Sequence, residues 1–453
     1  MIGAASERES LGAFAPATTS AVTQEQAPPA TWAATRVELA KLAVLPTTRI
    51  VLGVCLLAPL GFALVMRVQS AVPADTLFGR WAAASGFATS LTMLGFAGTW
   101  GLPILAGLIG GDSFSSEDRH GTWKTLLTRS CARGHIFLGK SLAVTALAVA
   151  ALVVLALSSV VSAVALVGTD PLVGLSGQLV PAGDAARLVL ASWGFMVLPM
   201  LVFVALAVFL SVVSRSGVVG VLGPAVIGLV LQLLSLLGSG EVVRAILPST
   251  PFDAWHGLFT TPRHYDPLLR GAIASIAWIM LLAAASRSAL RRRDFAGSDA
   301  VSSRPSRTPV RAAAVAAALV AVLAAAAGWG PTDVTAARLE QSIAPTFDNL
   351  VVLQYRRRTH SDQSTELHTR ATCGRSGVTG TSRGPGEDWT CSLRVLRPQV
   401  SGAAVNLDVS VHANGCYTAQ APASLVGQQR LRDVNGSSFV NPVYAFEGCL
   451  GTP

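Results

Sequence analysis

Seven long stretches of this chain contain no charged residue and no histidine, and they constrain the fold more than any other feature. A helix needs about 20 apolar residues to cross the hydrocarbon core of a bilayer, with a working range of about 17–25. Five stretches reach the required length, and the first and sixth would recruit flanking arginines whose side chains reach back to the headgroups. The sequence therefore predicts seven membrane spans, at Ile50–Met66, Trp81–Gly111, Ser141–Thr169, Leu188–Ser214, Ser216–Gly240, Gly271–Ser286 and Ala312–Thr332.

The composition agrees with a polytopic membrane protein. Apolar residues make up 51% of the chain and charged residues 13%, whereas soluble domains carry about 25% charged residues. So little charge could not cover a soluble surface, and the large apolar share excludes an intrinsically disordered chain. The net charge of +9 would suit nucleic acid on a soluble protein. Basic loops also orient membrane helices, so we expect the lipid bilayer as a partner and no nucleic acid.

The distribution of Lys and Arg indicates the orientation. With a cytoplasmic N-terminus, the inside segments hold seventeen basic residues and the outside loops before residue 330 hold six. Membrane proteins carry an excess of basic residues on the cytoplasmic side. We therefore expect a multi-pass protein of the plasma membrane, with its N-terminus in the cytoplasm. An odd number of spans then leaves residues 333–453 outside the cytoplasm.

The N-terminal 30 residues lack the short apolar core of a signal peptide and predict a disordered cytoplasmic tail. Thr31–Thr48 follows, with apolar residues spaced among Arg36, Glu38 and Lys41. This pattern fits an amphipathic helix on the inner membrane surface. A simple helical lead-in to the first span explains it equally well, and the sequence leaves both interpretations open.

Residues 333–453 have the character of a small α+β domain. Val405–Val411 alternates apolar and polar residues as a half-buried strand does, and Thr390–Leu396 alternates more loosely. Val334–Ile343 has helical spacing, while Asn414-Gly415 and Gly374–Gly386 are turn or loop signals. We expect one helix and four antiparallel strands.

Four of the six cysteines lie in this C-terminal part, as expected of disulfides in an oxidising compartment. Three pairings exist, and we predict Cys373–Cys391 and Cys416–Cys449. A zinc site is the competing interpretation, but it requires closely spaced cysteine pairs, which are absent here. Cys55 and Cys131 are expected to be reduced thiols.

The predicted spans offer no energy source of their own. Carriers driven by ion gradients place Asp, Glu or His within spans, and these spans contain none. Residues 134–141 match the phosphate-loop pattern GxxxxGK[ST]. That mechanism needs a buried strand before the loop and a soluble helix after it, whereas here a polar segment precedes a membrane span. We interpret the match as chance.

The polar stretch between the second and third spans is more informative. Gly121–Leu127 can form a short amphipathic helix with Trp123, Leu126 and Leu127 on its apolar side. Such a helix could fit a groove on a cytosolic partner. A charged loop that only enforces topology is the simpler alternative.

In this stretch an acidic residue precedes Gly-Thr, a Leu-Leu pair follows, and an Arg and a Lys lead into the third span. The residues are Asp112, Glu117, Gly121-Thr122, Leu126-Leu127, Arg133 and Lys140. This order, at this place, resembles the ABC-2 type permeases, the transmembrane subunits of ATP-binding-cassette exporters. Further support comes from Glu38 and Lys41 and from Leu247-Pro248…Pro251-Phe252. The resemblance covers residues 31 to about 293.

The resemblance implies half of a dimeric translocation path driven by separate ABC ATPase subunits, which would hold the ATP and Mg²⁺, so no cofactor is expected on this chain. A second permease subunit, identical or different, would complete the path. The residues at the ATPase contact would be Glu117, Arg119, Gly121, Thr122, Trp123 and Leu126.

The predicted fold is an all-α polytopic membrane core, a six-span ABC-2 permease plus a seventh span, with a small C-terminal α+β extracytoplasmic domain. The parts are a tail (1–30), the permease domain (31–293) with a cytoplasmic coupling segment (112–140) and an extracellular hairpin (241–267), a cytoplasmic linker (294–311), the seventh helix (312–332) and the disulfide-bonded domain (333–453).

Two other classes of function compete with transport. A membrane receptor or scaffold would use the helices to display the C-terminal domain. A membrane enzyme would draw on His and Asp residues in the hairpin, namely Asp253, His256, His264 and Asp266. The hairpin lacks a nucleophile motif, and its aromatic residues fit a membrane interface more simply. We therefore expect a transport subunit and no enzyme activity on this chain.

Overall fold

The computed structural model describes residues 30–68, 76–123, 132–236, 247–293, 334–361, 367–376, 382–395, 404–412 and 414–450. Outside these residues lie the predicted tail up to residue 29, the linker 294–311, the seventh span 312–332, Leu126 and Cys131.

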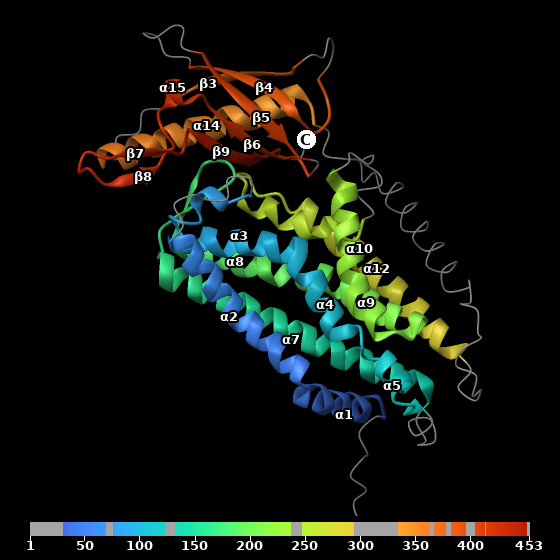
Figure 1. Ribbon diagram of the computed structural model, residues 1–453. Coiled ribbons are helices and arrows are strands. Elements are labelled where there is room, and N and C mark those ends of the chain that lie inside the picture. Colours follow the sequence, from blue (N-terminus) through green and yellow to red (C-terminus); the bar gives the residue numbers. More distant parts are fainter. Residues whose placement is uncertain are drawn as a thin grey trace, which may run out of the picture.

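Long apolar helices form a bundle, and a sheet with its own helix lies at one end of it (Figure 1). Among the described residues, five helical runs are long and apolar enough to cross a membrane: Pro46–Val68, Gly86–Arg119, Arg133–Val167, Ala182–Ser214 and Asp266–Arg291. A further apolar helix, α10 (Gly217–Leu236), is shorter in its described part. The prediction of a helical membrane core with a small C-terminal sheet region is thus confirmed in outline.

Several of these runs are built from consecutive helices. The bundle elements are α1 (Ala30–Val44), α2 (Pro46–Val68), η1 (Gly79–Trp81), α3 (Gly86–Phe96), the π-helix η2 (Ala97–Gly101), α4 (Leu102–Gly110), α5 (Ser115–Arg119), α7 (Arg133–Val167), β1 (Leu172–Val173), β2 (Leu179–Val180), α8 (Ala182–Phe195), α9 (Val197–Ser214), α10, η3 (Thr250–Phe259) and α12 (Asp266–Arg291).

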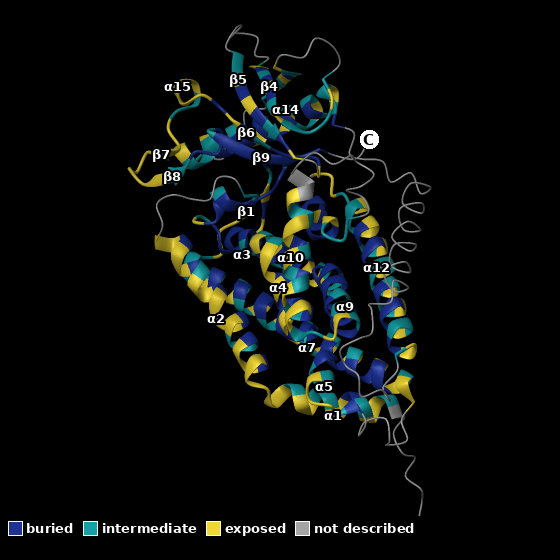
Figure 2. Ribbon diagram, turned by 45° about the vertical axis from the view of Figure 1, so that its right-hand side comes forward, coloured by how far each residue is buried: buried dark blue, intermediate teal, exposed yellow. Residues whose placement is uncertain are grey.

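The outer helices of the bundle carry many exposed residues (Figure 2), and large apolar residues are among them. Leu57 on α2, Val226 on α10 and Met280 on α12 are all more than half exposed. Water would disfavour such a surface, whereas the acyl chains of a bilayer match it. The outward apolar faces therefore fit helices that lie in lipid.

Helices α4 and α10 approach each other closely because glycines face across their contact. A Cβ atom added to Gly107 would overlap the backbone carbonyl of Val221, and one added to Gly111 would overlap the backbone of Gly220. Small residues at helix contacts let two backbones pack together in a membrane. These glycines fix the position of α4, which leads directly into α5.

We expect Gly107→Ala to destabilise the bundle by about 1–3 kcal/mol, the usual cost of overpacking. Gly61→Ala on α2 is the matched control, because nothing lies within 4 Å of its added Cβ. Thermal unfolding of both variants in lipid nanodiscs measures the difference. Equal midpoints for the two would contradict the close contact of α4 with α10.

The C-terminal region is a five-stranded antiparallel sheet packed against one long helix, here called the sheet domain (residues 334–450). The strand order is β3-β4-β5-β6-β9, and a separate hairpin pairs β7 with β8. The elements are α14 (Ala336–Thr359), β3 (Thr369–Arg375), β4 (Gly386–Val395), β5 (Ala404–Val411), β6 (Cys416–Gln420), α15 (Ala423–Val426), β7 (Arg430–Arg432), β8 (Ser438–Val440) and β9 (Ala445–Cys449).

The helix of this domain is longer than predicted. Helical spacing was expected over Val334–Ile343, whereas α14 runs from Ala336 to Thr359. Its buried residues recur every three or four positions along one face. The two predicted strands correspond to β4 and β5, and the main sheet has one strand more than the four expected. The polar, arginine-rich end of α14 obscured the continuation of the helix in the sequence.

Both predicted disulfides are confirmed, Cys373–Cys391 and Cys416–Cys449. Each joins directly opposed residues of neighbouring strands, β3 with β4 and β6 with β9. This arrangement uses all four cysteines in covalent bonds and overturns the zinc alternative. Cys55 is a buried free thiol.

Candidate functional site

The segment of residues 111–123, which follows α4, lies against the bundle at the end opposite the sheet domain, close to α1 (Figure 1). The Oγ of Ser211 on α9 accepts hydrogen bonds from the backbone N–H groups of Phe114 and Ser115, at 3.2 and 3.0 Å. These bonds satisfy donors at the start of α5 that have no partner within the helix. Gly121 then adopts a left-handed conformation with φ of +66°, and the chain turns there.

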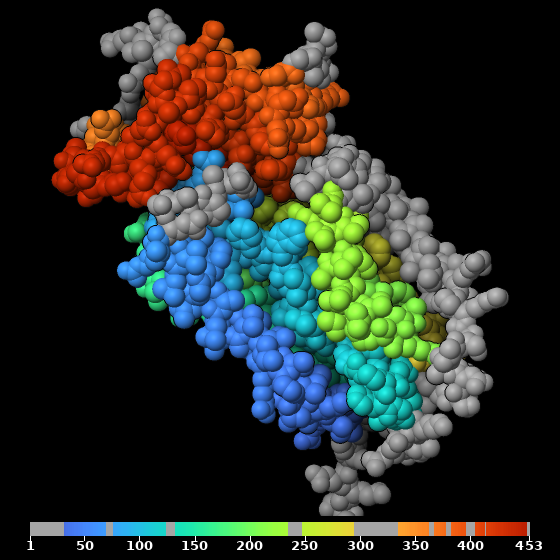
Figure 3. Space-filling model, in the orientation of Figure 1, coloured from blue at the N-terminus to red at the C-terminus, as the bar shows by residue number. Residues whose placement is uncertain are grey.

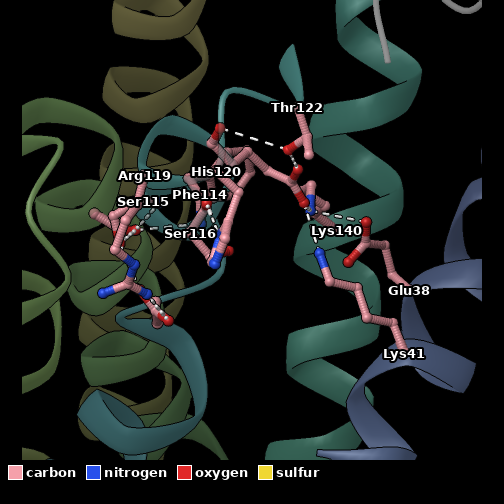
Figure 4. A network of polar contacts seen from close by, with 12 residues as sticks. Glu38, Lys41, Phe114, Ser115, Ser116, Arg119, His120, Thr122 and Lys140 are labelled. Carbon is pink, nitrogen blue, oxygen red and sulfur yellow. Dashed lines mark hydrogen bonds and ion pairs between the residues drawn. The ribbon is translucent and has the colours of Figure 1, made fainter. Parts of the chain in front are cut away.

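Glu117 on α5 is the centre of a buried ionic network (Figure 4). Its Oε1 lies 2.6 Å from Lys41 Nζ of α1 and 2.9 Å from Lys140 Nζ of α7. The Thr122 hydroxyl donates to its Oε2. Lys140 also pairs with Glu38 of α1 at 2.8 Å. Two carboxylates and two ammonium groups therefore join three separate elements.

The charges in this network balance, which is the condition for placing them out of water. Glu117 and Lys140 are only 4% and 2% exposed, and an isolated charge at such a position would be strongly disfavoured. Lys41 lies nearer the surface. Burial lowers the pKa of its ammonium, but the hydrogen bond to Glu117 and the nearby Glu38 carboxylate outweigh this and raise the pKa above its ordinary value.

Aromatic packing and a second ion pair complete the part of the segment that packs on the bundle, here called its base (Glu117, Asp118 and Trp123). Trp123 is 6% exposed and stacks on Phe114, with ring centroids 6.4 Å apart. The guanidinium of Arg293, at the end of α12, lies 5.8 Å from the Trp123 ring centroid and pairs with Asp118 of α5. A fourth element of the bundle is thereby tied to the segment.

Three consecutive residues form the exposed tip of the segment, here called the tip: Arg119, His120 and Gly121. The Nη2 of Arg119 lies 2.8 and 2.6 Å from the two carboxylate oxygens of Asp112. His120 Nδ1 lies 2.7 Å from the Ser116 carbonyl oxygen. Figure 4 shows Arg119 on the opposite side of the segment from Lys140. The tip can meet another molecule while its base stays anchored.

The predicted contact residues therefore divide into two groups. Arg119 and Gly121 are exposed, whereas Glu117 and Trp123 are buried and Thr122 is intermediate. The Trp123 ring, predicted on the apolar side of a helix that could meet a partner, packs inside this chain. Leu126 lies outside the described residues.

The resemblance drew on Glu38, Lys41 and Lys140 but did not predict that they form one network with Glu117. Ser211 and Arg293 were not predicted in this site. The rarity of lysine could have drawn attention to two of the residues in this network, because the chain has only three lysines: Lys41, Lys124 and Lys140. Arginine is the commoner basic residue throughout this chain. Two of the three lysines converge on one carboxylate.

The structure also explains the phosphate-loop match. Residues 134–141 lie within the continuous helix α7 and form no loop. The Lys140 ammonium is engaged by Glu38 and Glu117, and an added Cβ on Gly139 would collide with Ala34 of α1. The pattern therefore reflects helix packing and the buried network.

The His and Asp residues of the hairpin do not converge. Asp253 lines a small cavity with Thr99, Phe203 and Gln232, whereas His256 Nδ1 lies 3.9 Å from Cys416 Sγ of the sheet domain. Within the described part of the chain, no group of three or more His, Cys, Asp or Glu residues could hold a metal ion.

Comparison with models of protein families gives a match to part of the chain. A family model described as "Protein of unknown function (DUF2705)" matches residues 68–226, less than half of the chain. The matched part runs from the end of α2 into α10 and includes the whole of α5 and the tip. No curated protein matches the chain.

Proposed function

We propose that this chain is the membrane subunit of an ATP-driven exporter and that a separate ATPase docks on the tip. The observation that carries the proposal is the construction of the segment 115–123, in which ion pairs join the residues next to the exposed tip to α1, to α7 and to Arg293 just after α12. A loop that only enforced topology would need charge but no such anchoring.

The anchoring gives a path for mechanical coupling. A displacement of the tip moves α5, and Lys41, Lys140 and Arg293 carry that displacement to α1, α7 and α12. Ser211 adds α9 through its hydrogen bonds. Packed helices move as units because their interiors do not deform continuously. A push at one point can therefore reach most of the bundle.

Charge and redox chemistry support an orientation with the α1 and α5 end in the cytoplasm. The flanking segments at this end carry the excess of basic residues. The opposite end carries two disulfides, which persist in oxidising compartments outside the cytoplasm. ATP and Mg²⁺ would bind the partner ATPase, and a second permease subunit would complete the path in the lipid bilayer.

Charge reversal at the tip tests the ATPase contact. We expect Arg119→Glu to lower the recovery of a copurifying ATPase at least tenfold, equivalent to about 1.4 kcal/mol of binding. Arg187→Glu on α8 is the matched control, since Arg187 is also exposed and also pairs with a nearby aspartate, Asp184. Both tagged full-length variants are purified from native membranes and compared by quantitative mass spectrometry and ATP hydrolysis.

Equal recovery of the ATPase with the two variants would contradict docking at the tip. Hydrolysis of ATP by the purified chain alone, or no ATPase with the unchanged protein, would contradict the exporter as a whole. The second of these outcomes would favour the receptor or scaffold alternative, which is consistent with a sheet domain that rests on the bundle.

A further inference from the structure

The sheet domain covers one end of the helix bundle through a continuous interface (Figures 1 and 3). On the bundle side, the interface consists of the segment around η1, the turn between β1 and β2, and η3. On the domain side, β9, β6 and α14 contribute. These contacts join residues more than 150 positions apart in the chain.

A buried carboxyl group lies within this interface. Glu447 on β9 is 6% exposed, and its Oε2 accepts a hydrogen bond from the Phe78 backbone N–H at 2.6 Å. Arg80 Nε lies 3.8 Å from its Oε1. Phe78 is held in a left-handed conformation, φ of +63°, between Trp255 and Phe259 of η3.

The contacts around Glu447 show close fit rather than loose apposition. Asn349 of α14 donates a hydrogen bond to the Ser176 carbonyl at 2.8 Å. A Cβ added to Gly448 would lie 3.0 Å from the Leu175 carbonyl oxygen. Leu175 is 2% exposed beneath this strand. Separation of the domain from the bundle would therefore bring water to both Glu447 and Leu175.

We propose that the sheet domain is a lid on this end of the bundle, latched by Glu447 and released as the pH rises. The proposal goes beyond the transport function, because it concerns an opening that requires neither ATP nor substrate. In the docked state the carboxyl is out of water, which favours its neutral form. The hydrogen bond from Phe78 and the Arg80 guanidinium favour the charged form but do not outweigh this burial.

The direction of the pH effect follows from this burial. Burial raises the pKa of Glu447 to about 7, against an ordinary value of 4.5. A carboxyl whose pKa is higher when docked than when free binds a proton more tightly in the docked state. Docking is therefore strongest below pH 4.5 and weakens as pH rises through 7. The equilibrium constant for docking falls by up to tenfold per pH unit. Over the whole interval between the two pKa values it falls by about 100-fold or more.

Other titratable groups at the interface differ from Glu447 in their effect. The phenol of Tyr417 on the adjacent strand has a pKa raised by burial to about 12. His256 of η3 opposes Glu447, because burial lowers its pKa to about 3 and exposure would let it take up a proton at a higher pH. Comparing the protein with a neutral variant at Glu447 at each pH gives the part of the pH dependence of docking that comes from this carboxyl.

Thiol modification of a residue beneath the lid measures release even when open molecules are rare. Leu175→Cys is introduced into the full-length protein in lipid nanodiscs, with Cys55 and Cys131 replaced by alanine and the disulfides intact. A charged thiol reagent labels the introduced thiol only when the lid opens. The rate is compared with that of the same protein carrying Glu447→Gln, whose amide oxygen can still accept the bond from Phe78. Glu387→Gln, at an exposed position of β4, is the control.

The measured quantity is the labelling rate with Glu447 intact divided by the rate of the Glu447→Gln variant at the same pH. We expect this ratio to rise about 100-fold between pH 4.5 and 8, with no such rise when Glu387→Gln takes the place of Glu447→Gln. A ratio that stays constant with pH would overturn the latch. Complete protection of the thiol in every variant at every pH would overturn the lid itself. Neither outcome involves the ATPase, so the failure of this proposal is separate from failure of the transport function.

Discussion

Replacing Glu117 with glutamine is expected to lower the free energy of unfolding by about 3–5 kcal/mol, the range for removing one partner of a buried ion pair. Glu117 serves both Lys41 and Lys140 at hydrogen-bonding distance. Glutamine keeps the shape but not the charge, so Lys140, which is 2% exposed, retains only Glu38 as a counter-charge. Denaturant unfolding of the full-length protein in nanodiscs measures the loss.

A second substitution separates charge imbalance from loss of packing. In Glu117→Gln/Lys140→Met one carboxylate and one ammonium are left, Glu38 and Lys41, so the charges balance again. The double variant should recover most of the stability, since contacting residues have non-additive effects. Asp112→Asn is the control, since its partly exposed side chain pairs with Arg119 outside this network, and it is expected within about 1 kcal/mol of the unchanged protein. Additive losses for Glu117 and Lys140 would contradict a shared network.

The role of Glu117 in stability also determines which variants can test the coupling of the ATPase to the membrane helices. Because Glu117 holds the base of the segment, its removal disturbs α1 and α7 as well as any partner contact. Loss of transport in a Glu117 variant would not distinguish the two effects. Arg119 lies on the exposed tip and forms its ion pair with Asp112 of the same segment. Variants at Arg119 test docking with the anchoring network in place.

The sequence predicted the elements that depend on local pattern. Apolar runs long enough for a bilayer indicated the helices of the core, and alternation indicated β4 and β5. The cysteine pairing agreed with strand neighbours because Cys373 and Cys391 flank a short connection, 18 residues apart. In each case the decisive interaction is between residues close in the chain or of a type that has few alternatives.

The candidate site could be predicted only in part, because its contacts are long-range. Glu117 contacts Lys41, 76 residues away in the sequence, and Lys140, 23 residues away. Neither periodicity nor motif spacing predicts contacts of this kind. Trp123 has the spacing of an amphipathic helix, but Arg293 and Phe114 decide that it points inward. The lid contact of Glu447 with Phe78 spans 369 residues, and no feature of either local sequence indicates it.

Removing the Cys416–Cys449 disulfide by double alanine substitution is expected to destabilise the sheet domain by about 3–4 kcal/mol, the value for closing a loop of this length. Its cysteines are 33 residues apart, against 18 for Cys373–Cys391. The chain-entropy effect of the two bridges therefore differs by only about 0.5 kcal/mol. A measurement of domain unfolding alone should find the two variants nearly equal.

Their positions make the two variants differ in docking. Cys416 lies against His256 of the bundle, and β9 carries both Cys449 and Glu447. Cys373–Cys391 joins β3 to β4, at the other edge of the sheet. We expect the Cys416/Cys449 variant alone to increase tryptic cleavage at Arg80 under native conditions. Only the bridge at the interface is expected to couple the stability of the domain to its contact with the bundle. Equal cleavage at Arg80 in the two variants would contradict this coupling, and cleavage as slow as in the unchanged protein would show that β9 stays docked without its disulfide.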